Sequence, residues 1–136
     1  MRLTKRVEFC AAHRYSRRDW SEAENRQAFG RAANLHGHNY VLEVTIEGEP
    51  SAETGMVMDL KTLKAVISEA VLDRLDHVNL NVDLSEFRDK LPTPENLAVQ
   101  IWHWLAPRLT DCRLQRIRLH EDETLYVDYL GEQSDV

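Results

Sequence analysis

The chain has 136 residues, of which 43% are hydrophobic and 29% are charged, a composition typical of one globular domain with its own core. Acidic residues outnumber basic ones by 23 to 17, and no run of Lys and Arg forms a stripe, which argues against nucleic acids and anionic membranes as partners. No apolar run is long enough to span a membrane, and no signal peptide is recognisable. Two cysteines do not make a disulfide framework, so we expect one cytoplasmic domain over residues 1–136.

The first part of the chain predicts strands. Apolar residues alternate from about residue 3 to residue 15 and place His13 on the apolar face. A short helix or ordered loop is expected over residues 19–29, and a second strand over residues 36–47. After a turn signal, residues 56–59 can return as a third strand.

Helical periodicity begins at Leu60, where Asp59 is placed to cap a helix that continues to about residue 71. A polar loop is expected over residues 76–92, after which Thr93 caps a second helix with Pro94 at its first position. Two closing strands are expected at about residues 112–121 and 124–130. This order predicts an α+β fold, with two helices on one face of an antiparallel sheet whose edges pair with other subunits.

The sharpest local feature is the sequence His36-Gly37-His38. Residues i and i+2 of a strand point to the same side, so both imidazoles can reach one ion, and antiparallel pairing would bring His13 beside them. Three imidazoles with an open fourth position are typical of a catalytic zinc site, although imidazole also suits other transition metals. From spacing alone, an exposed pair of histidines is the commoner outcome.

Two further features have both a catalytic and a structural interpretation. Asp76 stands beside His77, and such a carboxylate can orient an imidazole that moves protons. A histidine interacting with the dipole at the end of a helix is the more frequent arrangement. Glu121 closes a predicted strand within an acidic run, where most carboxylates are simply solvated.

Taken together, these motifs resemble the 6-pyruvoyltetrahydropterin synthase and 6-carboxytetrahydropterin synthase family. The segments that carry the resemblance are Phe9-Cys10-Ala11-Ala12-His13-Arg14, Asn34-Leu35-His36-Gly37-His38-Asn39-Tyr40, Thr54-Gly55-Met56-Val57-Met58-Asp59-Leu60, Leu75-Asp76-His77-Val78-Asn79-Leu80, Pro92-Thr93-Pro94-Glu95-Asn96, Ile101-Trp102 and Glu121. Their order and spacing cover nearly the whole chain.

The resemblance implies the tunnelling fold, in which the antiparallel sheets of several subunits close into a barrel with the helices outside. It also implies a homo-hexamer with active sites at subunit interfaces. The implied substrate is 7,8-dihydroneopterin triphosphate, a small-molecule pterin. By the same resemblance, zinc is held by His13, His36 and His38, and polarises the hydroxyls of the substrate side chain.

The family resemblance also assigns roles to residues outside the zinc site. Glu121 would accept hydrogen bonds from the pterin ring, and Thr93 lies where the family also touches the pterin. Asp76 and His77 match the proton-relay pair of the family.

One position departs from the family pattern. The family carries a cysteine base shortly before the His-Gly-His motif, and in the queuosine-pathway enzymes it lies four residues before the first histidine, which here is Ala32. A second branch has glutamate instead and releases a hydroxymethylpterin for folate synthesis, but Ala32 is not a glutamate either. The alanine therefore indicates an engineered loss of the base or a branch with different chemistry, and it predicts intact binding with weak turnover.

Cys10 is the other cysteine near the proposed metal site in sequence. It lies three residues before His13, so strand alternation places it on the opposite face, which argues against it as the replacement base. The leading interpretation is a zinc-dependent lyase of the queuosine or tetrahydrobiopterin pathway, with a 6-carboxy or a 6-pyruvoyl product. The alternative is a pterin-binding relative that lacks catalysis.

Overall fold

The computed structural model describes residues 1–131. Its strands are β1 Arg2–His13, β2 His36–Glu47, β3 Val78–Asn79, β4 Arg113–Asp122 and β5 Leu125–Tyr129. Its α-helices are α1 Glu22–Phe29, α2 Leu60–Ile67, α3 Asp73–Leu75, α4 Leu80–Asp83 and α5 Pro94–Leu105. The short 3₁₀ turns are η1 Gly30–Ala33, η3 Ser85–Phe87 and η4 Ala106–Arg108, and a π-helical turn, η2 Ser68–Leu72, joins α2 to α3.

The strands form one open sheet in the order β3-β1-β2-β4-β5. The long strands pair antiparallel as expected, with His13 opposite His36 at one end of the β1–β2 ladder. The expectation of a wholly antiparallel sheet is wrong at β3, which pairs parallel to β1. This two-residue strand lies inside the segment expected to be a polar loop, and only its pairing with β1 reveals it.

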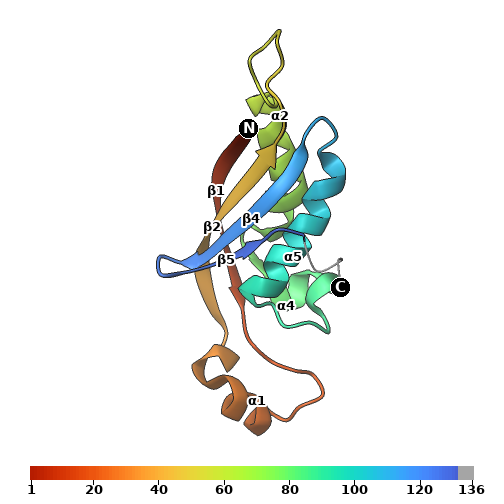
Figure 1. Cartoon of the computed structure of the whole chain (residues 1–136). Coiled ribbons are helices and arrows are strands. Elements are labelled where there is room, and N and C mark those ends of the chain that lie inside the picture. Colours follow the sequence, from red (N-terminus) through yellow and green to blue (C-terminus); the bar gives the residue numbers. More distant parts are fainter. Residues whose placement is uncertain (132–136) are drawn as a thin grey trace.

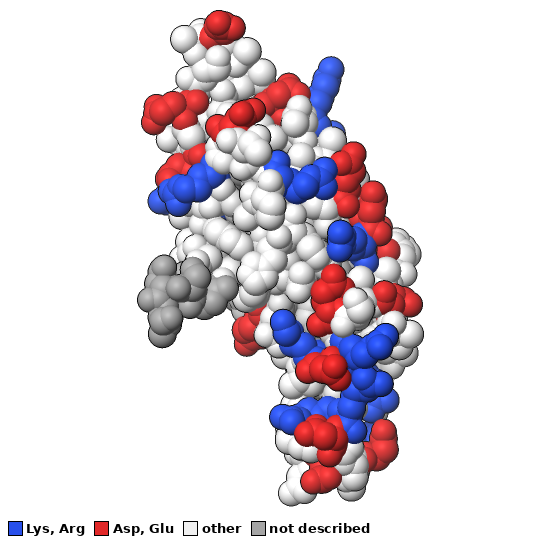
Figure 2. All heavy atoms as spheres, turned by 90° about the vertical axis from the view of Figure 1, so that its right-hand side faces the viewer, with Lys and Arg blue, Asp and Glu red and all other residues white. Residues whose placement is uncertain are grey.

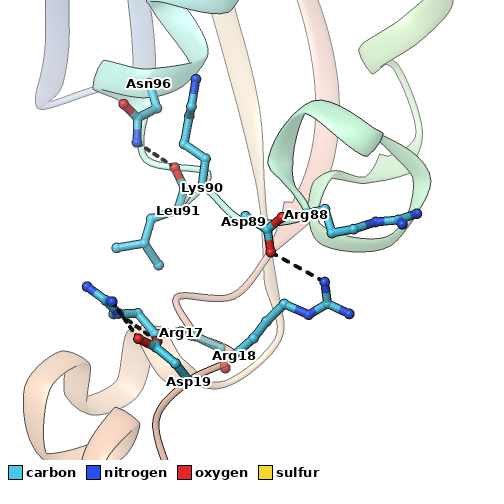
Figure 3. Close-up of a pocket in the computed structure, with 9 residues that line it drawn as sticks. Arg17, Arg18, Asp19, Arg88, Asp89, Lys90, Leu91 and Asn96 are labelled. Atoms are coloured by element: carbon cyan, nitrogen blue, oxygen red, sulfur yellow. Dashed lines mark hydrogen bonds and ion pairs between the residues drawn. The ribbon is translucent and has the colours of Figure 1, made fainter.

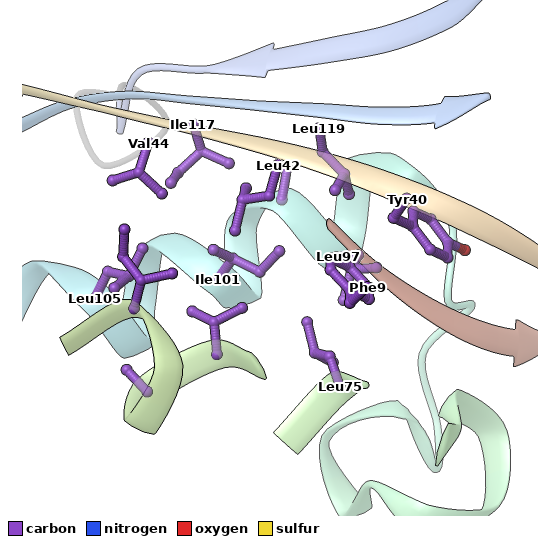
Figure 4. Packing of buried hydrophobic residues seen from close by; sticks show 14 of the residues in the cluster. Phe9, Tyr40, Leu42, Val44, Leu75, Leu97, Ile101, Leu105, Ile117 and Leu119 are labelled. Carbon is purple, nitrogen blue, oxygen red and sulfur yellow. The ribbon is translucent and has the colours of Figure 1, made fainter. Parts of the chain in front are cut away.

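The helices cover one face of this sheet, as predicted for an α+β fold. Figure 1 shows α2, α4 and α5 together on one side of the strands, whereas α1 lies beyond the end of the sheet. Buried side chains of the strands and helices form a single core, to which Leu42 of β2 and Leu97 and Ile101 of α5 all belong (Figure 4). Burial of such leucines and isoleucines from water is the main term that holds the layers together.

The expected helix caps are present. Ser21 and Glu24 make both hydrogen bonds of a capping box at the start of α1. Thr93 accepts the N–H of Asn96 at the start of α5, and Asp59 accepts the N–H of Thr62 at the start of α2. Residues 56–59 do not form the expected third strand, because they lead directly from a turn into this Asp59 cap.

No helix within residues 1–131 has the length and apolar character needed to cross a membrane.

Candidate active site

Three imidazoles converge at the end of the β1–β2 ladder. His13 is the last residue of β1 and is fully buried, while His36 and His38 open β2 on the same face. The ring centroids lie 4.6 Å apart for His13 and His36, and 5.1 Å apart for each of the other two pairs. One nitrogen of each ring lies within 4.8 Å of the others. The structure therefore brings together the three residues that strand pairing predicted, and their role as metal ligands stays a prediction.

The hydrogen bonds of the rings show which nitrogens face inward. The Nδ1–H of His13 donates to the carbonyl oxygen of Pro92 at 2.8 Å, and that of His36 donates to the carbonyl oxygen of Asn34 at 2.7 Å. Metal-binding histidines characteristically donate their second N–H in this way, which leaves Nε2 as the ligand atom. Among residues 1–131, Nε2 of His13 and Nε2 of His38 are buried without a hydrogen-bond partner. Buried polar atoms are seldom unsatisfied, so these two nitrogens fit a metal ion.

The electrostatics of His13 favour its neutral form. The pKa of His13 is lowered from 6.5 to about 4, chiefly by burial, with His36 and His38 adding to the shift and the Pro92 carbonyl opposing it. Only a neutral imidazole offers a lone pair to a metal. The surroundings of His13 therefore hold it ready for ligation at neutral pH.

Glu121 lies beside the three imidazoles, near the end of β4. One of its oxygens is 3.9 Å from Nε2 of His38, and its side chain is only 12% exposed. Its other oxygen, Oε2, is buried and accepts no hydrogen bond from any described residue. Burial raises the pKa of Glu121, with the charge of Asp122 adding to the shift and His38 opposing it. A largely buried carboxylate with one unsatisfied oxygen is suited to a ligand that donates N–H groups.

Thr93 and Ala32 are each linked to this cluster through one other residue. Thr93 follows Pro92, whose carbonyl binds His13, and its hydroxyl is already used to cap α5. Ala32 lies in η1, and its carbonyl oxygen accepts the N–H of Tyr15 at 2.8 Å. The Tyr15 ring packs edge-on against His13, with centroids 5.2 Å apart. Ala32, the position expected to carry the base, therefore contacts Tyr15, and Tyr15 contacts the histidine cluster.

Asp76 and His77 form a second cluster with Cys10, and not with the three histidines. A carboxylate oxygen of Asp76, a ring nitrogen of His77 and the sulfur of Cys10 lie within 4.8 Å of one another. The backbone N–H of Cys10 lowers the pKa of Asp76, and a hydrogen bond from His77 lowers it as well. Cys10 pairs with Asn39 on the face of β1 opposite to that of His13, as strand alternation predicts. What alternation could not show is that Asp76 and His77 lie there too.

A basic pocket lies next to the loop that ends at Pro92. Its cavity of about 440 Å³ is lined by Arg17, Arg18, Arg88 and Lys90 among others, and cationic side chains outnumber carboxylates by four to two (Figure 3). Arg17 pairs with Asp19 and Arg18 pairs with Asp89, so the pocket keeps a positive surplus. Figure 2 shows Lys and Arg side chains gathered on the lower part of one face, intermixed with a few carboxylates.

Sequence reasoning missed this pocket because its cations come from two segments about seventy residues apart, and neither is a basic run long enough to stand out. The nearest signal was the short sequence Arg17-Arg18 after the first strand. The pocket and the histidine cluster are connected by two consecutive residues of the chain. Leu91, which lines the pocket, is followed at once by Pro92.

Comparisons with known proteins agree with the architecture and the motifs. The family model described as 6-pyruvoyl tetrahydropterin synthase matches residues 2–132. The 6-pyruvoyl tetrahydrobiopterin synthase of Dictyostelium discoideum is 42% identical over 130 residues, covering 96% of this chain and 96% of that protein. The enzyme of the same name from Homo sapiens is 40% identical over 132 residues, covering 96% of this chain and 91% of that protein.

A solved structure of Caenorhabditis elegans 6-pyruvoyl tetrahydropterin synthase superposes on this fold with a TM-score of 0.90 at 34% identity, over 97% of this chain and 96% of that chain. The match is therefore nearly complete in sequence and in fold. The chain belongs to the 6-pyruvoyl tetrahydropterin synthase family.

Proposed function

We propose that this protein is a zinc-dependent lyase that acts on 7,8-dihydroneopterin triphosphate. The observation that carries the proposal is the cluster of His13, His36 and His38, in which two buried Nε2 atoms have no hydrogen-bond partner among residues 1–131. Of the two products left open by the sequence, 6-pyruvoyl-tetrahydropterin is favoured, because the relatives at 40–42% identity bear the name of that synthase.

The three histidines would hold the zinc, with the Pro92 and Asn34 carbonyls fixing the orientation of two of the rings. When bound, the metal supplies Lewis-acid polarisation of the side-chain hydroxyls of the substrate. Glu121 would receive the pterin ring, because its buried oxygen lacks a donor that the ring N–H groups can provide.

The basic pocket is the part of this chain best suited to the triphosphate. Arg17, Arg18, Arg88 and Lys90 supply charge-assisted donors, and the pocket lies one residue along the chain from the carbonyl that orients His13. Binding at both ends would place the short side chain of the substrate between Glu121 and the basic pocket, against the histidine cluster.

Ala32 supports a second candidate function, a pterin-binding protein without catalysis. An alanine has no proton to exchange, so a site that relied on this position for its base would bind substrate and turn it over weakly. Zinc, Glu121 and the basic pocket would be retained in such a protein. Both functions predict binding of the pterin substrate, but only the lyase predicts its rapid turnover.

Product analysis separates these functions. The zinc-loaded protein is incubated with 7,8-dihydroneopterin triphosphate, and released products are identified by mass spectrometry. We expect inorganic triphosphate and 6-pyruvoyl-tetrahydropterin. A 6-carboxy product would reassign the product class, and binding without any product would support the non-catalytic function. The His36→Ala/His38→Ala double variant is the matched control, and unchanged turnover in it would contradict the zinc site.

A further inference from the structure

A thiol, an imidazole and a carboxylate meet on the open face of the sheet. The Cys10 sulfur, a His77 ring nitrogen and an Asp76 oxygen lie within 4.8 Å of one another. These are the residue types of an activated nucleophile or base, in which an oriented imidazole takes the thiol proton. Both cysteines of the chain are free, so this thiol is available for chemistry.

Backbone contacts hold the three groups in place. Asp76 accepts the N–H of Cys10 at 3.0 Å, and its Oδ1 lies 3.0 Å from Nδ1 of His77, which orients the ring. The N–H of His77 donates to the carbonyl oxygen of Cys10 at 2.6 Å. His77 adopts a φ of 65°, a left-handed conformation that is uncommon for a residue other than glycine. Such conformations persist where the surroundings enforce them, and they concentrate at functional sites.

The cluster opens onto space large enough for a ligand. A cavity of about 650 Å³ lies against it and is lined by Cys10, His77, Gly37, Asn39 and Asp83 among others. The His77 side chain is 77% exposed, so a neighbouring molecule can reach it. The cluster is therefore accessible as well as ordered.

We propose that Cys10 is the catalytic thiol of this protein and takes the place of the base missing at Ala32, a role that rests on the proposed function. His77 activates the thiol and Asp76 positions His77. Because Cys10 and His13 lie on opposite faces of β1, we infer that the thiol of one copy serves the histidine cluster of a second copy.

The step assigned to Cys10 is a proton shift. In the thiolate form, with its own proton on His77, the sulfur takes a proton from the side-chain carbon attached to the pterin ring, so that a C–H bond breaks and an S–H bond forms. The electron pair of the C–H bond becomes a carbon–carbon double bond to the ring. The electrons of the adjacent carbon–nitrogen double bond then bind, at the ring nitrogen, the proton held by His77, which leaves a neutral thiol and a neutral imidazole. One hydrogen has moved from carbon to nitrogen, and no oxidant or reductant is required.

Alkylation with iodoacetamide tests the activated thiol without substrate or metal. Followed by mass spectrometry near pH 7, Cys10 should react roughly tenfold or more faster than Cys112, and His77→Gln should remove most of the difference. Cys112 is the internal reference, half-buried beside the start of β4 with its pKa raised by burial, so the loss of the difference in His77→Gln is the deciding result. Equal rates for the two thiols, or no effect of His77→Gln, would overturn the activation of Cys10.

Turnover tests the catalytic role. Cys10→Ser should lower kcat by roughly 10²–10⁴-fold with little change in KM, as expected for loss of a general base, while Cys112→Ser stays near the parent. A Cys10→Ser variant with full activity would overturn this inference and leave the proposed lyase standing. A parent protein that binds the substrate without turnover would instead overturn the lyase, and the alkylation rates would still decide whether Cys10 is activated.

Subunit mixing tests the shared site. Cys10→Ser chains are coexpressed with His36→Ala/His38→Ala chains, neither of which should be active alone. Mixed oligomers should regain activity well above both parents, because some sites then combine an intact thiol with intact histidines. Mixtures no more active than the parents would overturn the sharing of the site between copies.

Discussion

The Nδ1–H of His13 donates a hydrogen bond to the carbonyl oxygen of Pro92 at 2.8 Å, which ties the end of β1 to the residue before the Thr93 cap of α5. This contact selects the tautomer that leaves Nε2 of His13 facing the other two imidazoles. The geometry of the histidine cluster thus depends on a backbone atom seventy-nine residues away along the chain.

The first prediction is a stoichiometric metal. Protein purified without added metal should contain about one divalent ion per chain by elemental analysis, as in sites with three histidine ligands. The metal should be released as the pH falls below about 6.5, because protonated imidazoles do not ligate. His36→Ala/His38→Ala should abolish occupancy, whereas His103→Ala, an exposed change on α5, should not. Full occupancy in the double variant would rule out this site.

The second prediction concerns the metal-free fold and pH. The pKa of His13 is lowered to about 4 from 6.5, so the unfolded chain binds a proton more readily than the folded one. The free energy of unfolding should therefore fall as the pH drops from about 6.5 towards 4, by an amount on the order of 3 kcal/mol.

Urea titrations of the metal-free protein between pH 7.5 and pH 4 measure this loss. The His13→Asn variant should be less stable at pH 7.5 and should show a flatter dependence. His103→Gln is the control and should follow the parent curve. A His13→Asn curve parallel to that of the parent would show that another group carries the pH dependence.

Much of this centre was predictable from local pattern. Alternation places His36 and His38 on one face of their strand, and antiparallel pairing with the first strand was expected from the sequence to bring His13 beside them, as the register of β1 against β2 does. The caps at Asp59 and Thr93 follow equally from residue type and position. Such features depend on neighbours in the sequence or on the pairing of two long strands.

Features that depend on distant contacts could not be predicted. The strand β3 has two residues and no periodicity, and it forms only because β1 offers it backbone partners. The meeting of Cys10 with Asp76 and His77 follows from that pairing. Alternation correctly placed Cys10 on the face of β1 opposite to the histidine cluster, but it gave no information about which other residues lie on that face. The basic pocket could not be predicted either, because its lining residues come from two distant segments of the chain.

The third prediction concerns Glu121. Replacing it with Gln should weaken binding of 7,8-dihydroneopterin by about 10- to 100-fold, since a charge-assisted hydrogen bond is worth roughly 1.5–3 kcal/mol. Isothermal titration with the metal-loaded protein gives the affinity. Glu123→Gln removes the same charge from an exposed position two residues away and should leave the affinity within twofold of the parent. Equal losses in the two variants would indicate a general charge effect instead of a pterin contact.

The fourth prediction is a closed oligomer. β5 lies at one edge of the sheet, and exposed apolar residues occur on it and nearby, including Leu125, Tyr126 and Leu130. Edge strands of this kind pair with other chains unless they are blocked, and the family resemblance implies a hexamer. Sedimentation at micromolar concentration should give one species of about six chains. Tyr126→Lys should shift it towards smaller species, with Val82→Lys, an exposed change on α4, as the control. A monomer that still turns over substrate would contradict the shared site.

The last prediction concerns a thiol introduced at Ala32, where the family resemblance expects a cysteine. In the Cys10→Ser background, Ala32→Cys should raise kcat by roughly 10²–10⁴-fold with KM nearly unchanged, because it restores a group used in the transition state and not in binding. Arg31→Cys puts a thiol on the neighbouring exposed residue of η1 and should restore little. In the parent background, Ala32→Cys should change kcat by less than about tenfold, since Cys10 already supplies the base. A hundredfold gain in the parent background would mean that the base was missing from Ala32 and had not been replaced by Cys10.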